Sequence, residues 1–398
     1  MTTSKAARWG AVSIFALAST WNYLDRQVLA AAAPSVRAEF HLNNAQYGWV
    51  LAAFSLAYAI ASPATGWLLD WLGLEIGIAS AVTMWSISSA LGGISRGFGQ
   101  LLGSRVLLGA FESAGIPAAG KLNASYLEPE NRAIGAAMTQ VGLSIAGVAA
   151  PVLVAAMPGW RQPFFVCAAL GLLWIPVFLL AKRKVAPYEE IRPRRESGGL
   201  QILRERRLQI LVLANILWMG SYSLWTNWTS AYLIYAFPLT VKSVAPFAWV
   251  PPVAATLGAF AGGWLSRRAM MRGRTAFEAR LWGTFISAIG CLIILTVPLC
   301  QTPLAASLAI SASSFWAVAG SVNLYTIPVD IWGGERAGMA ISALVFGYGL
   351  LQACISPLIG WVVDHHGYTP VFRLLAPLPL LAWWLLRSVR DRSSSPEP

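Results

Sequence analysis

The residues Asn22-Tyr23-Leu24-Asp25-Arg26 lie inside an apolar stretch that runs from about Trp9 to Ala33. This stretch is long enough to cross a lipid bilayer as a helix. An Asp beside an Arg inside a membrane helix is costly and persists mainly where the side chains face a protein interior or a water-filled cavity. The pair therefore indicates an ion or substrate path. A structural pair that holds helices together is the alternative.

Composition places the chain among membrane proteins with several crossings. Of its 398 residues, 57% are hydrophobic and 12% are charged, whereas a soluble domain carries about 25% charged residues. The net charge is +12, and the basic residues lie in short loops, which indicates membrane topology rather than nucleic-acid binding. The four cysteines and three histidines show no metal-type spacing, so we expect no metal and no cofactor.

Apolar runs separated by turn or charge signals predict twelve crossings. Their approximate ranges are 9–33, 45–69, 76–95, 99–121, 132–156, 160–181, 208–235, 244–265, 277–299, 303–328, 337–363 and 369–389. A long basic segment, 182–207, separates the sixth and seventh crossings and divides the chain into a first half, 1–181, and a second half, 208–398. We expect a short basic amphipathic helix near Leu200 to Leu208 and a disordered polar tail from about Arg390.

Loop charges predict the orientation of the chain. With the N-terminus inside, the outer segments hold only Arg37, Arg96, Arg161 and Lys242. The other loop lysines and arginines lie on the inner side, among them Lys121, Arg132 and Arg280. The excess of basic residues on one side predicts that both termini are cytoplasmic and that the chain lies in the cytoplasmic (inner) membrane.

An internal repeat supports the number of crossings. Ser62–Asp70 ends the second crossing and Ser356–Asp364 ends the eleventh, and both read Ser-Pro-x-x-Gly-Trp-apolar-apolar-Asp. Gly263-Trp264-Leu265 ends the eighth crossing similarly. Nested inverted repeats within two parallel halves are a recurrent plan of secondary transporters, although chance similarity between apolar segments is the alternative.

At this point the sequence resembles the major facilitator superfamily. The residues that carry the resemblance are Gly66-x-x-x-Asp70-x-x-Gly73 after the second crossing, Arg105-Val106-Leu107-Leu108-Gly109 in the fourth, and Gly142, Gly147 and Pro151 in the fifth. The resemblance implies an all-α membrane protein with twelve transmembrane helices in two pseudo-symmetric six-helix bundles. It also implies transport rather than an enzymatic reaction, with Gly66, Asp70 and Gly73 acting as a conformational latch.

The residues Tyr23, Asp25 and Arg26, together with Glu112, are similar to the anion:cation symporter branch of this superfamily. That branch moves organic anions, such as sugar acids and carboxylates, with protons. The resemblance therefore implies proton-coupled symport of a small organic anion, a carboxylate, by alternating access. Phe346 stands where the branch often has an Asn, and this loss of an amide favours a smaller or more apolar carboxylate than a sugar acid.

Two further departures from the superfamily pattern concern the expected latch. Trp71 and Glu75 replace basic residues of the loop signature, and Arg267 stands where the matching second loop commonly has an acid. The latch of the family helps to lock the outward-facing state, so these replacements leave its strength in this chain open.

Four ionisable residues fall inside the first half: Asp25, Arg26, Arg105 and Glu112. Adjacent residues of a helix point about 100° apart, so Asp25 and Arg26 cannot face one spot. Arg26 offers a planar charged fork for a carboxylate, whereas Asp25 and Glu112 are groups that can exchange a proton in a low-dielectric interior. Arg105 is either a proton-path residue or a snorkelling anchor at a helix end. Two carboxyl groups permit one or two protons per anion, and two would make transport of a monoanion carry net charge.

Further polar residues are candidates for contacts with the substrate, although interhelical hydrogen bonding and aromatic packing are the alternatives for them. They are Tyr23, Gln140 and Ser144 in the first half, and Tyr222, Asn227, Trp228, Tyr232, Asn323 and Tyr348 in the second.

Two other functions fit the sequence less well. An exporter or exchanger of amphiphilic compounds with the same fold agrees with the aromatic second half and with Phe346, but Arg26 beside Asp25 favours an anion. A receptor, an enzyme or an ATP-driven pump is disfavoured because the sequence has no P-loop and no nucleophile motif. The expected partners are a small organic anion, protons and the lipid bilayer, and we expect a monomer.

Overall fold

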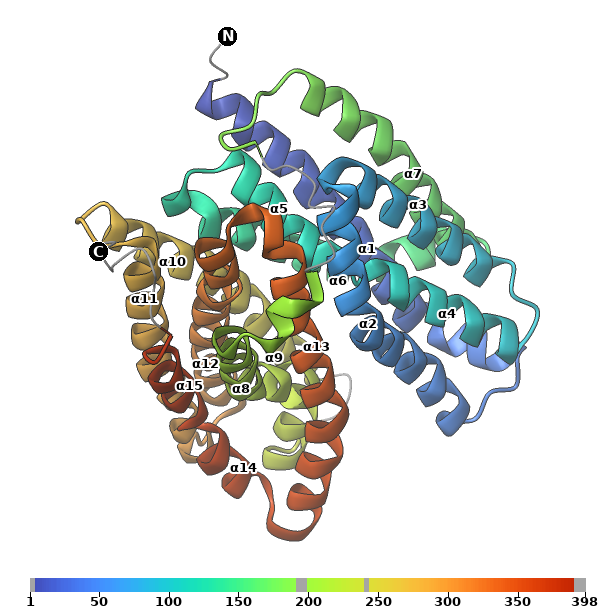
Figure 1. Cartoon of the computed structure of the whole chain (residues 1–398). Helices are drawn as coiled ribbons and strands as arrows, with labels where there is room; N and C mark the ends of the chain where they lie inside the picture. Colours follow the sequence, from blue (N-terminus) through green and yellow to red (C-terminus); the bar gives the residue numbers. More distant parts are fainter. Residues whose placement is uncertain (1–3, 191–198, 240–242, 390–398) are drawn as a thin grey trace. The chain divides into compact units, whose positions relative to one another are not determined.

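The computed structural model describes residues 4–190, 199–239 and 243–389, and most of these residues are helical (Figure 1). The α-helices are α1 (Lys5–Glu39), α2 (Asn44–Leu72), α3 (Leu74–Gly93), α4 (Phe98–Glu112), α5 (Gly115–Tyr126), α6 (Arg132–Ala156), α7 (Gln162–Arg183), α8 (Arg206–Ala236), α9 (Ala245–Ala248), α10 (Val250–Met270), α11 (Ala276–Cys291), α12 (Pro303–Leu324), α13 (Ile327–His366), α14 (Tyr368–Leu375) and α15 (Leu378–Leu386). Three 3₁₀ helices are η1 (Pro129–Asn131), η2 (Gly199–Arg204) and η3 (Leu292–Leu299). Each predicted crossing corresponds to one helix or to consecutive helices, and no strand occurs in the described ranges.

Eight helical segments of the described chain are long and apolar enough to span a membrane by length and composition. They are Gln46–Leu72, Leu74–Gly93, Pro129–Ala156, Gln162–Arg183, Arg206–Ala236, Ala276–Leu299, Pro303–Leu324 and Tyr368–Leu386. The other four predicted crossings correspond to α1, the pair α4 and α5, α10 and α13. The polar residues of α1, including Asp25 and Arg26, lower its mean hydropathy, and α4 and α5 are separate short helices.

Glycine and proline explain two of the helix boundaries. Gly73 has a φ of 80°, a conformation that side chains with a Cβ avoid, and it ends α2 and starts α3. Pro117 has no backbone N–H to continue the ladder of α4, and the chain bends at Ser113 and Ala114 before α5 begins. The crossing predicted at 337–363 is longer in the structure, because α13 begins at Ile327 and continues through a kink at Gly333, whose φ is 67°.

The chain packs as two compact units. Unit 1 contains Met1–Glu128, Met138–Ile202 and Trp332–Gly349, and unit 2 contains Pro129–Ala137, Leu203–Ile331 and Leu350–Pro398. Unit 1 therefore combines most of the first half with part of α13, and unit 2 combines most of the second half with the short segment that begins α6.

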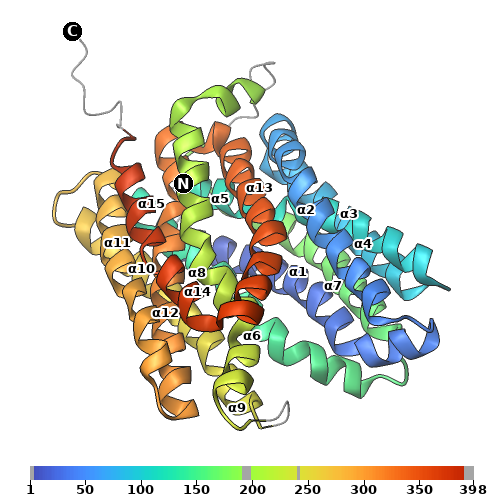
Figure 2. The ribbon, with the colours of Figure 1, turned by 90° about the horizontal axis from the view of Figure 1, so that it is seen from below.

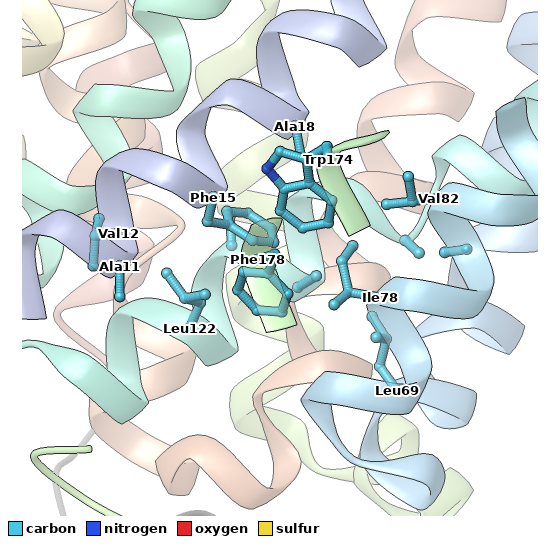
Figure 3. Close-up of a cluster of buried hydrophobic side chains, with 14 of the residues drawn as sticks. Ala11, Val12, Phe15, Ala18, Leu69, Ile78, Val82, Leu122, Trp174 and Phe178 are labelled. Atoms are coloured by element: carbon cyan, nitrogen blue, oxygen red, sulfur yellow. The ribbon is translucent and has the colours of Figure 1, made fainter. Parts of the chain in front are cut away.

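Each unit has its own apolar core. In unit 1, Phe15 of α1 packs edge-on against Trp174 and Phe178 of α7, and these two rings stack on each other (Figure 3). In unit 2, Trp225 and Tyr232 of α8 pack with residues of α14 in a cluster of buried side chains. Aromatic packing of this kind fixes the helices that carry the polar residues described below.

Two close helix contacts occupy corresponding places in the two halves of the chain. A Cβ atom at Gly109 of α4 would lie 3.2 Å from Phe54 Cα of α2, and one at Gly262 of α10 would lie 2.7 Å from Ala319 Cα of α12. Small residues let helix backbones approach closely in membranes. The second and fourth crossings and the eighth and tenth crossings thus pack in the same way, in agreement with the internal repeat.

Part of the basic linker is defined. The expected amphipathic helix near Leu200 to Leu208 is a short 3₁₀ helix, η2, followed directly by α8, and Ile202 within it is buried. The predicted linker charges Arg192, Arg194 and Arg195 and the predicted disordered tail, 390–398, lie outside the described residues.

Candidate functional site

Arg26 of α1 forms an ion pair with Glu112 at the end of α4. Its Nε donates to Glu112 Oε2 over 2.8 Å, and its Nη2 donates to Asn22 Oδ1, one turn earlier in α1, over 3.0 Å. The Glu112 side chain is fully buried, whereas the Arg26 side chain keeps 28% of its surface exposed. The pair thus joins a shielded acid to a cation that a ligand can reach.

Three aromatic rings surround the guanidinium of Arg26. Its Cζ lies 5.4 Å from the ring centroid of Tyr23, 4.8 Å from Phe54 and 4.7 Å from Tyr58. Phe54 and Tyr58 are one turn apart on α2. A cation over ring faces is stabilised by their quadrupoles, and the rings also restrict the orientation of the planar fork.

The close packing of α2 and α4 places Glu112 at this site. Gly109 lies three residues before Glu112, and it allows α4 to approach the backbone of Phe54. Beyond Glu112 the Ser113 hydroxyl shares a 2.9 Å hydrogen bond with Thr65 of α2. The end of α4 is thereby held against the helix that supplies two of the rings.

Asp25 lies in different surroundings from its neighbour Arg26. Only 1% of Asp25 is exposed, and its Oδ1 accepts a hydrogen bond from the Ser89 hydroxyl of α3. Cys167 of α7 and Arg105 of α4 are its other polar neighbours, but Arg105 does not lie within ion-pair distance in the described chain. Asp25 and Arg26 are adjacent in α1 but therefore belong to two separate clusters of polar side chains.

Arg105 is 2% exposed and does not reach towards water. Its Cζ lies 5.1 Å from the ring centroid of Phe164 of α7. A Cβ atom at Gly92 of α3 would lie 3.2 Å from Arg105 Nη2, so the glycine leaves room for the guanidinium. This position lies in the interior of unit 1. It argues against the interpretation of Arg105 as an anchor that extends to the membrane surface.

Several buried polar atoms of this region have no hydrogen-bond partner within the described residues. They are Asn22 Nδ2, Asp25 Oδ2, Arg105 Nε and Nη2, and Glu112 Oε1. Buried polar groups in folded proteins are normally paired, so these atoms retain the capacity to bond to a proton or to a polar ligand. The two arginines and the two carboxyl groups also balance in charge when all four are ionised.

The residues of the predicted latch lie together at the end of α2. Asp70 Oδ1 accepts from Lys121 Nζ over 2.7 Å and from the Gly338 amide over 3.1 Å, and Oδ2 accepts from the Met339 amide over 2.9 Å. Lys121, which the loop-charge count placed on the inner surface, is 1% exposed. Asp70 thus binds two main-chain amides of α13 just after its kink at Gly333, in addition to a buried cation.

The other two residues of the predicted latch, Gly66 and Gly73, contribute through their lack of a side chain. A Cβ atom at Gly66 would lie 2.5 Å from the Gly338 carbonyl oxygen, so only glycine permits this approach of α2 to α13. Ser62, one turn earlier, donates to the Ser342 carbonyl over 3.2 Å. Gly73 provides the sharp turn after Asp70.

Unit 2 contains a second buried ion network. Arg280 of α11, fully buried, donates from Nε to Asp330 Oδ2 over 3.1 Å, from Nη1 to the Ser266 hydroxyl over 2.6 Å, and from Nη2 to the Pro129 carbonyl over 2.5 Å. Arg132 Nη1 also lies 3.5 Å from Asp330 Oδ1. Arg280 and Arg132 were counted as loop charges from the sequence, but in the structure they hold η1 and the start of α6 against α10 and α11.

The profile of the Major Facilitator Superfamily matches residues 15–337, more than half of the chain. The chain belongs to the Major Facilitator Superfamily. It is therefore a membrane transporter and not an enzyme.

Similar proteins support this assignment. The hexuronate transporter of Escherichia coli (strain K12) is 25% identical over 413 residues, which cover 96% of this chain and 95% of that protein. The galacturonate transporter of Dickeya chrysanthemi is 29% identical over 283 residues, 66% of this chain and 82% of that protein. A structure of the E. coli fucose:proton symporter superposes with a TM-score of 0.76 at 15% identity, over 96% of this chain and 98% of that chain. The facilitator fold implies twelve helices, as the sequence predicted.

The other residues that were predicted to contact the substrate of this facilitator lie in both units. In unit 1, Tyr23, Gln140, Ser144 and Tyr348 are all partly exposed. In unit 2, Asn227 Nδ2 donates to Gln352 Oε1 over 3.2 Å, and the same oxygen accepts from the Ser223 hydroxyl over 2.7 Å.

Four further predicted substrate contacts take part in packing or in hydrogen bonds to the backbone. Tyr222 packs on a small cluster of buried side chains in unit 2, and the Trp228 ring lies 6.3 Å from that of Tyr368. Tyr232 donates to the Val297 carbonyl within the core, and fully buried Asn323 donates to the carbonyls of Gly262 and Ala319. These bonds engage the Tyr232 hydroxyl and Asn323 Nδ2, whereas Asn323 Oδ1 is buried without a hydrogen-bond partner within the described residues.

Sequence reasoning missed several residues of the site. Phe54 and Tyr58 have the i, i+4 spacing of one helix face, which is the signal that identifies them as a pair, but apolar and aromatic residues are common throughout the chain. Ser89 and Cys167 have no distinguishing sequence context, and only the packing of α3 and α7 brings them to Asp25.

Proposed function

We propose that this facilitator is a proton-coupled symporter of a small organic anion, a carboxylate, that works by alternating access. The observation that carries the proposal is the pairing of Arg26, partly exposed, with Glu112, fully buried, over 2.8 Å. In this arrangement a substrate carboxylate and the Glu112 carboxylate compete for one guanidinium. Protonation of Glu112 removes the competitor and leaves the Arg26 fork to the substrate.

The charge balance gives the coupling. Asp25, Arg26, Arg105 and Glu112 sum to zero when ionised, so a bound monoanion adds one uncompensated negative charge. Two unit charges 4 Å apart interact by about 4 kcal/mol at an effective dielectric constant of about 20. A proton on Glu112 restores neutrality, so the loaded and the empty carrier both pass through a closed state with little net buried charge.

Asp25 is the second proton-coupling group, and Arg105 is its positive neighbour. If both carboxyl groups take up a proton, two protons accompany one monoanion and transport carries net positive charge inward. An uptake rate that does not respond to an imposed membrane potential would contradict the second proton.

The site and the relatives support this substrate class. The two relatives described above are named for hexuronate and galacturonate, which are carboxylates, and Arg26 fits a carboxylate with two parallel hydrogen bonds. Half-buried Phe346 lies in the part of α13 that belongs to unit 1. A phenyl ring cannot hydrogen-bond a hydroxyl, which favours a smaller or less hydroxylated acid than a hexuronate.

The other assignments complete the proposal. Tyr23, Gln140, Ser144 and Tyr348 in unit 1, and Tyr222, Asn227 and Trp228 in unit 2, are the candidates for further substrate contacts. Gly66, Asp70 and Gly73 act as the latch, with Lys121 in place of the basic loop residues that this chain lacks. The protein works as a monomer in the inner membrane with both termini in the cytoplasm.

The test is uptake into proteoliposomes of labelled monocarboxylates and sugar acids, with and without an inward proton gradient. Loss of a charged, hydrogen-bonded partner costs about 2 to 5 kcal/mol, so Arg26→Ala should lower uptake on the order of 100-fold. The matched control is Arg96→Ala, which removes an exposed arginine from the same unit. The symport proposal would be refuted by equal activity of Arg26→Ala and wild type, or by the lack of gradient-driven uptake of any anion. The export of amphiphilic compounds would then be the favoured function.

A further inference from the structure

We propose that unit 2 carries a binding site for the headgroups of anionic phospholipids, formed by the adjoining ends of α10, α11 and α15. The site is independent of the charge cluster in unit 1. It consists of three exposed arginines that each lie over a tryptophan ring, together with the α10–α11 loop, and it is called the Arg–Trp patch below.

Three pairs define the Arg–Trp patch. The Cζ atom lies 5.1 Å from the ring centroid in the pair Arg268 and Trp264, 5.5 Å in Arg274 and Trp282, and 5.3 Å in Arg387 and Trp383. All three arginines are exposed. A guanidinium over an indole face is held in place without losing its charge, so its edge N–H groups remain available to phosphate oxygens.

The three pairs lie at one end of the helices that carry them. The loop 271–275 joins the end of α10 to the start of α11. Trp383 of α15 packs on Phe285 of α11 with ring centroids 4.4 Å apart, one turn beyond Trp282. The helices α10, α11 and α15 lie side by side in both views (Figures 1 and 2). The arginines therefore converge on one surface.

The charges of this surface are not neutralised within the described part of the chain. Arg268, Arg272, Arg274 and Arg387 form no ion pair there, and the nearby acid Glu278 bonds to the Thr275 amide at the start of α11. In unit 1, by contrast, Lys5 pairs with Glu128 and Lys182 with Glu75. The patch is thus a concentration of positive charge without ion pairs among the residues that the structure describes.

The surroundings favour a lipid over a soluble polyanion. Trp264 is 49% exposed, Trp384 is 61% exposed, and Met271 in the loop is 70% exposed. Both tryptophans lie on helices that correspond to predicted crossings, and tryptophan side chains on such helices are enriched at the headgroup level of a bilayer. Exposed apolar rings next to unpaired arginines match the acyl chains and the phosphate of one anionic phospholipid, whereas a free phosphate would contact only the arginines.

The experiment uses the full-length protein, purified and stripped of lipid, and measures binding of phosphatidylglycerol and of phosphatidylcholine with the same acyl chains by native mass spectrometry. The test variant is R268Q/R274Q/R387Q. The control is K5Q/K182Q/R183Q, which removes three positive charges from unit 1. Thermal unfolding in phosphatidylcholine checks that the variants are folded, and single substitutions replace any triple variant that is not.

Basic residues near an anionic membrane surface contribute about fivefold each to binding. We therefore expect wild type and control to prefer phosphatidylglycerol, and the test variant to bind it at least about tenfold more weakly with unchanged binding of phosphatidylcholine. Equal losses in the test variant and the control would show diffuse attraction and overturn the proposal, as would wild type without any lipid preference. Competition by millimolar inorganic phosphate that displaces the lipid fully would identify a free anion site instead and also overturn it.

Discussion

Replacement of Glu112 by glutamine separates anion binding from proton binding at the candidate site. In wild type the ionised carboxylate holds Arg26 Nε over 2.8 Å, and raising the pH ionises more Glu112 and so weakens anion binding. Because Glu112 takes up one proton for each anion bound, this residue alone should raise the dissociation constant of the anion tenfold per pH unit wherever free Glu112 is ionised. In Glu112→Gln this contribution to the slope should be absent, because the amide does not titrate, and any slope that remains reports on Asp25.

The magnitude follows from the ion pair. Charges about 4 Å apart at an effective dielectric constant of about 20 interact by about 4 kcal/mol, and the glutamine oxygen keeps a hydrogen bond to Arg26 worth about 1 kcal/mol. The free energy of anion binding is therefore more favourable in Glu112→Gln than in wild type by about 3 kcal/mol. This difference corresponds to binding on the order of 100-fold tighter at alkaline pH. Proton-driven accumulation should be lost, whereas exchange of labelled for unlabelled anion should persist.

The assay is isothermal titration of the anion into purified protein between pH 6 and pH 9, together with counterflow and gradient-driven uptake in proteoliposomes. Glu278→Gln is the control, because Glu278 is exposed and a glutamine retains its bond at the start of α11. The reasoning fails if Glu112→Gln keeps the wild-type pH slope, or if wild type shows none.

Two further predictions concern stability. Asp70→Asn removes the charge that faces Lys121, which is 1% exposed, and should lower the free energy of unfolding by about 3 to 5 kcal/mol; the double variant with Lys121→Met should recover part of this loss, and no recovery in thermal unfolding would argue against the pair. At the end of α1, hydrogen bonds from Trp160 and Arg161 lower the pKa of Glu39, so its small contribution to stability is present above the ordinary glutamate pKa of about 4.3 and is lost as the pH falls through the lowered value. Glu39→Gln should therefore melt at a lower temperature than wild type at pH 6 but not at pH 2.5, and an equal difference at both would contradict this assignment.

The sequence identified the charged residues because charge inside an apolar helix stands out against its surroundings. Asp25, Arg26, Arg105 and Glu112 were all found in this way. The argument that adjacent helical residues cannot face one spot also predicted separate surroundings for Asp25 and Arg26, and the structure shows them with Ser89 and with Glu112. The sequence did not reveal these partners, because a hydrogen bond between helices depends on packing and leaves no local pattern.

The predicted latch shows the same division. The spacing of Gly66, Asp70 and Gly73 indicated its place, but the missing basic loop residues left its partners open. The structure supplies Lys121 and two amides of α13. These groups lie far along the chain from Asp70, and no sequence rule connects a carboxylate to main-chain amides exposed by a kink.

By itself, the sequence determined the number of crossings, the superfamily and the four membrane charges, because hydrophobic length, turn signals and buried charge are local properties of a chain. Tertiary structure alone decided which groups pair with those charges. It enclosed Arg26 between three aromatic rings, turned Arg280 from an expected loop charge into a fully buried one, and gathered three Arg–Trp pairs on one surface. The physical reason is that close helix packing brings together residues that are distant in sequence, and electrostatic energy depends on those distances and on the burial that packing creates.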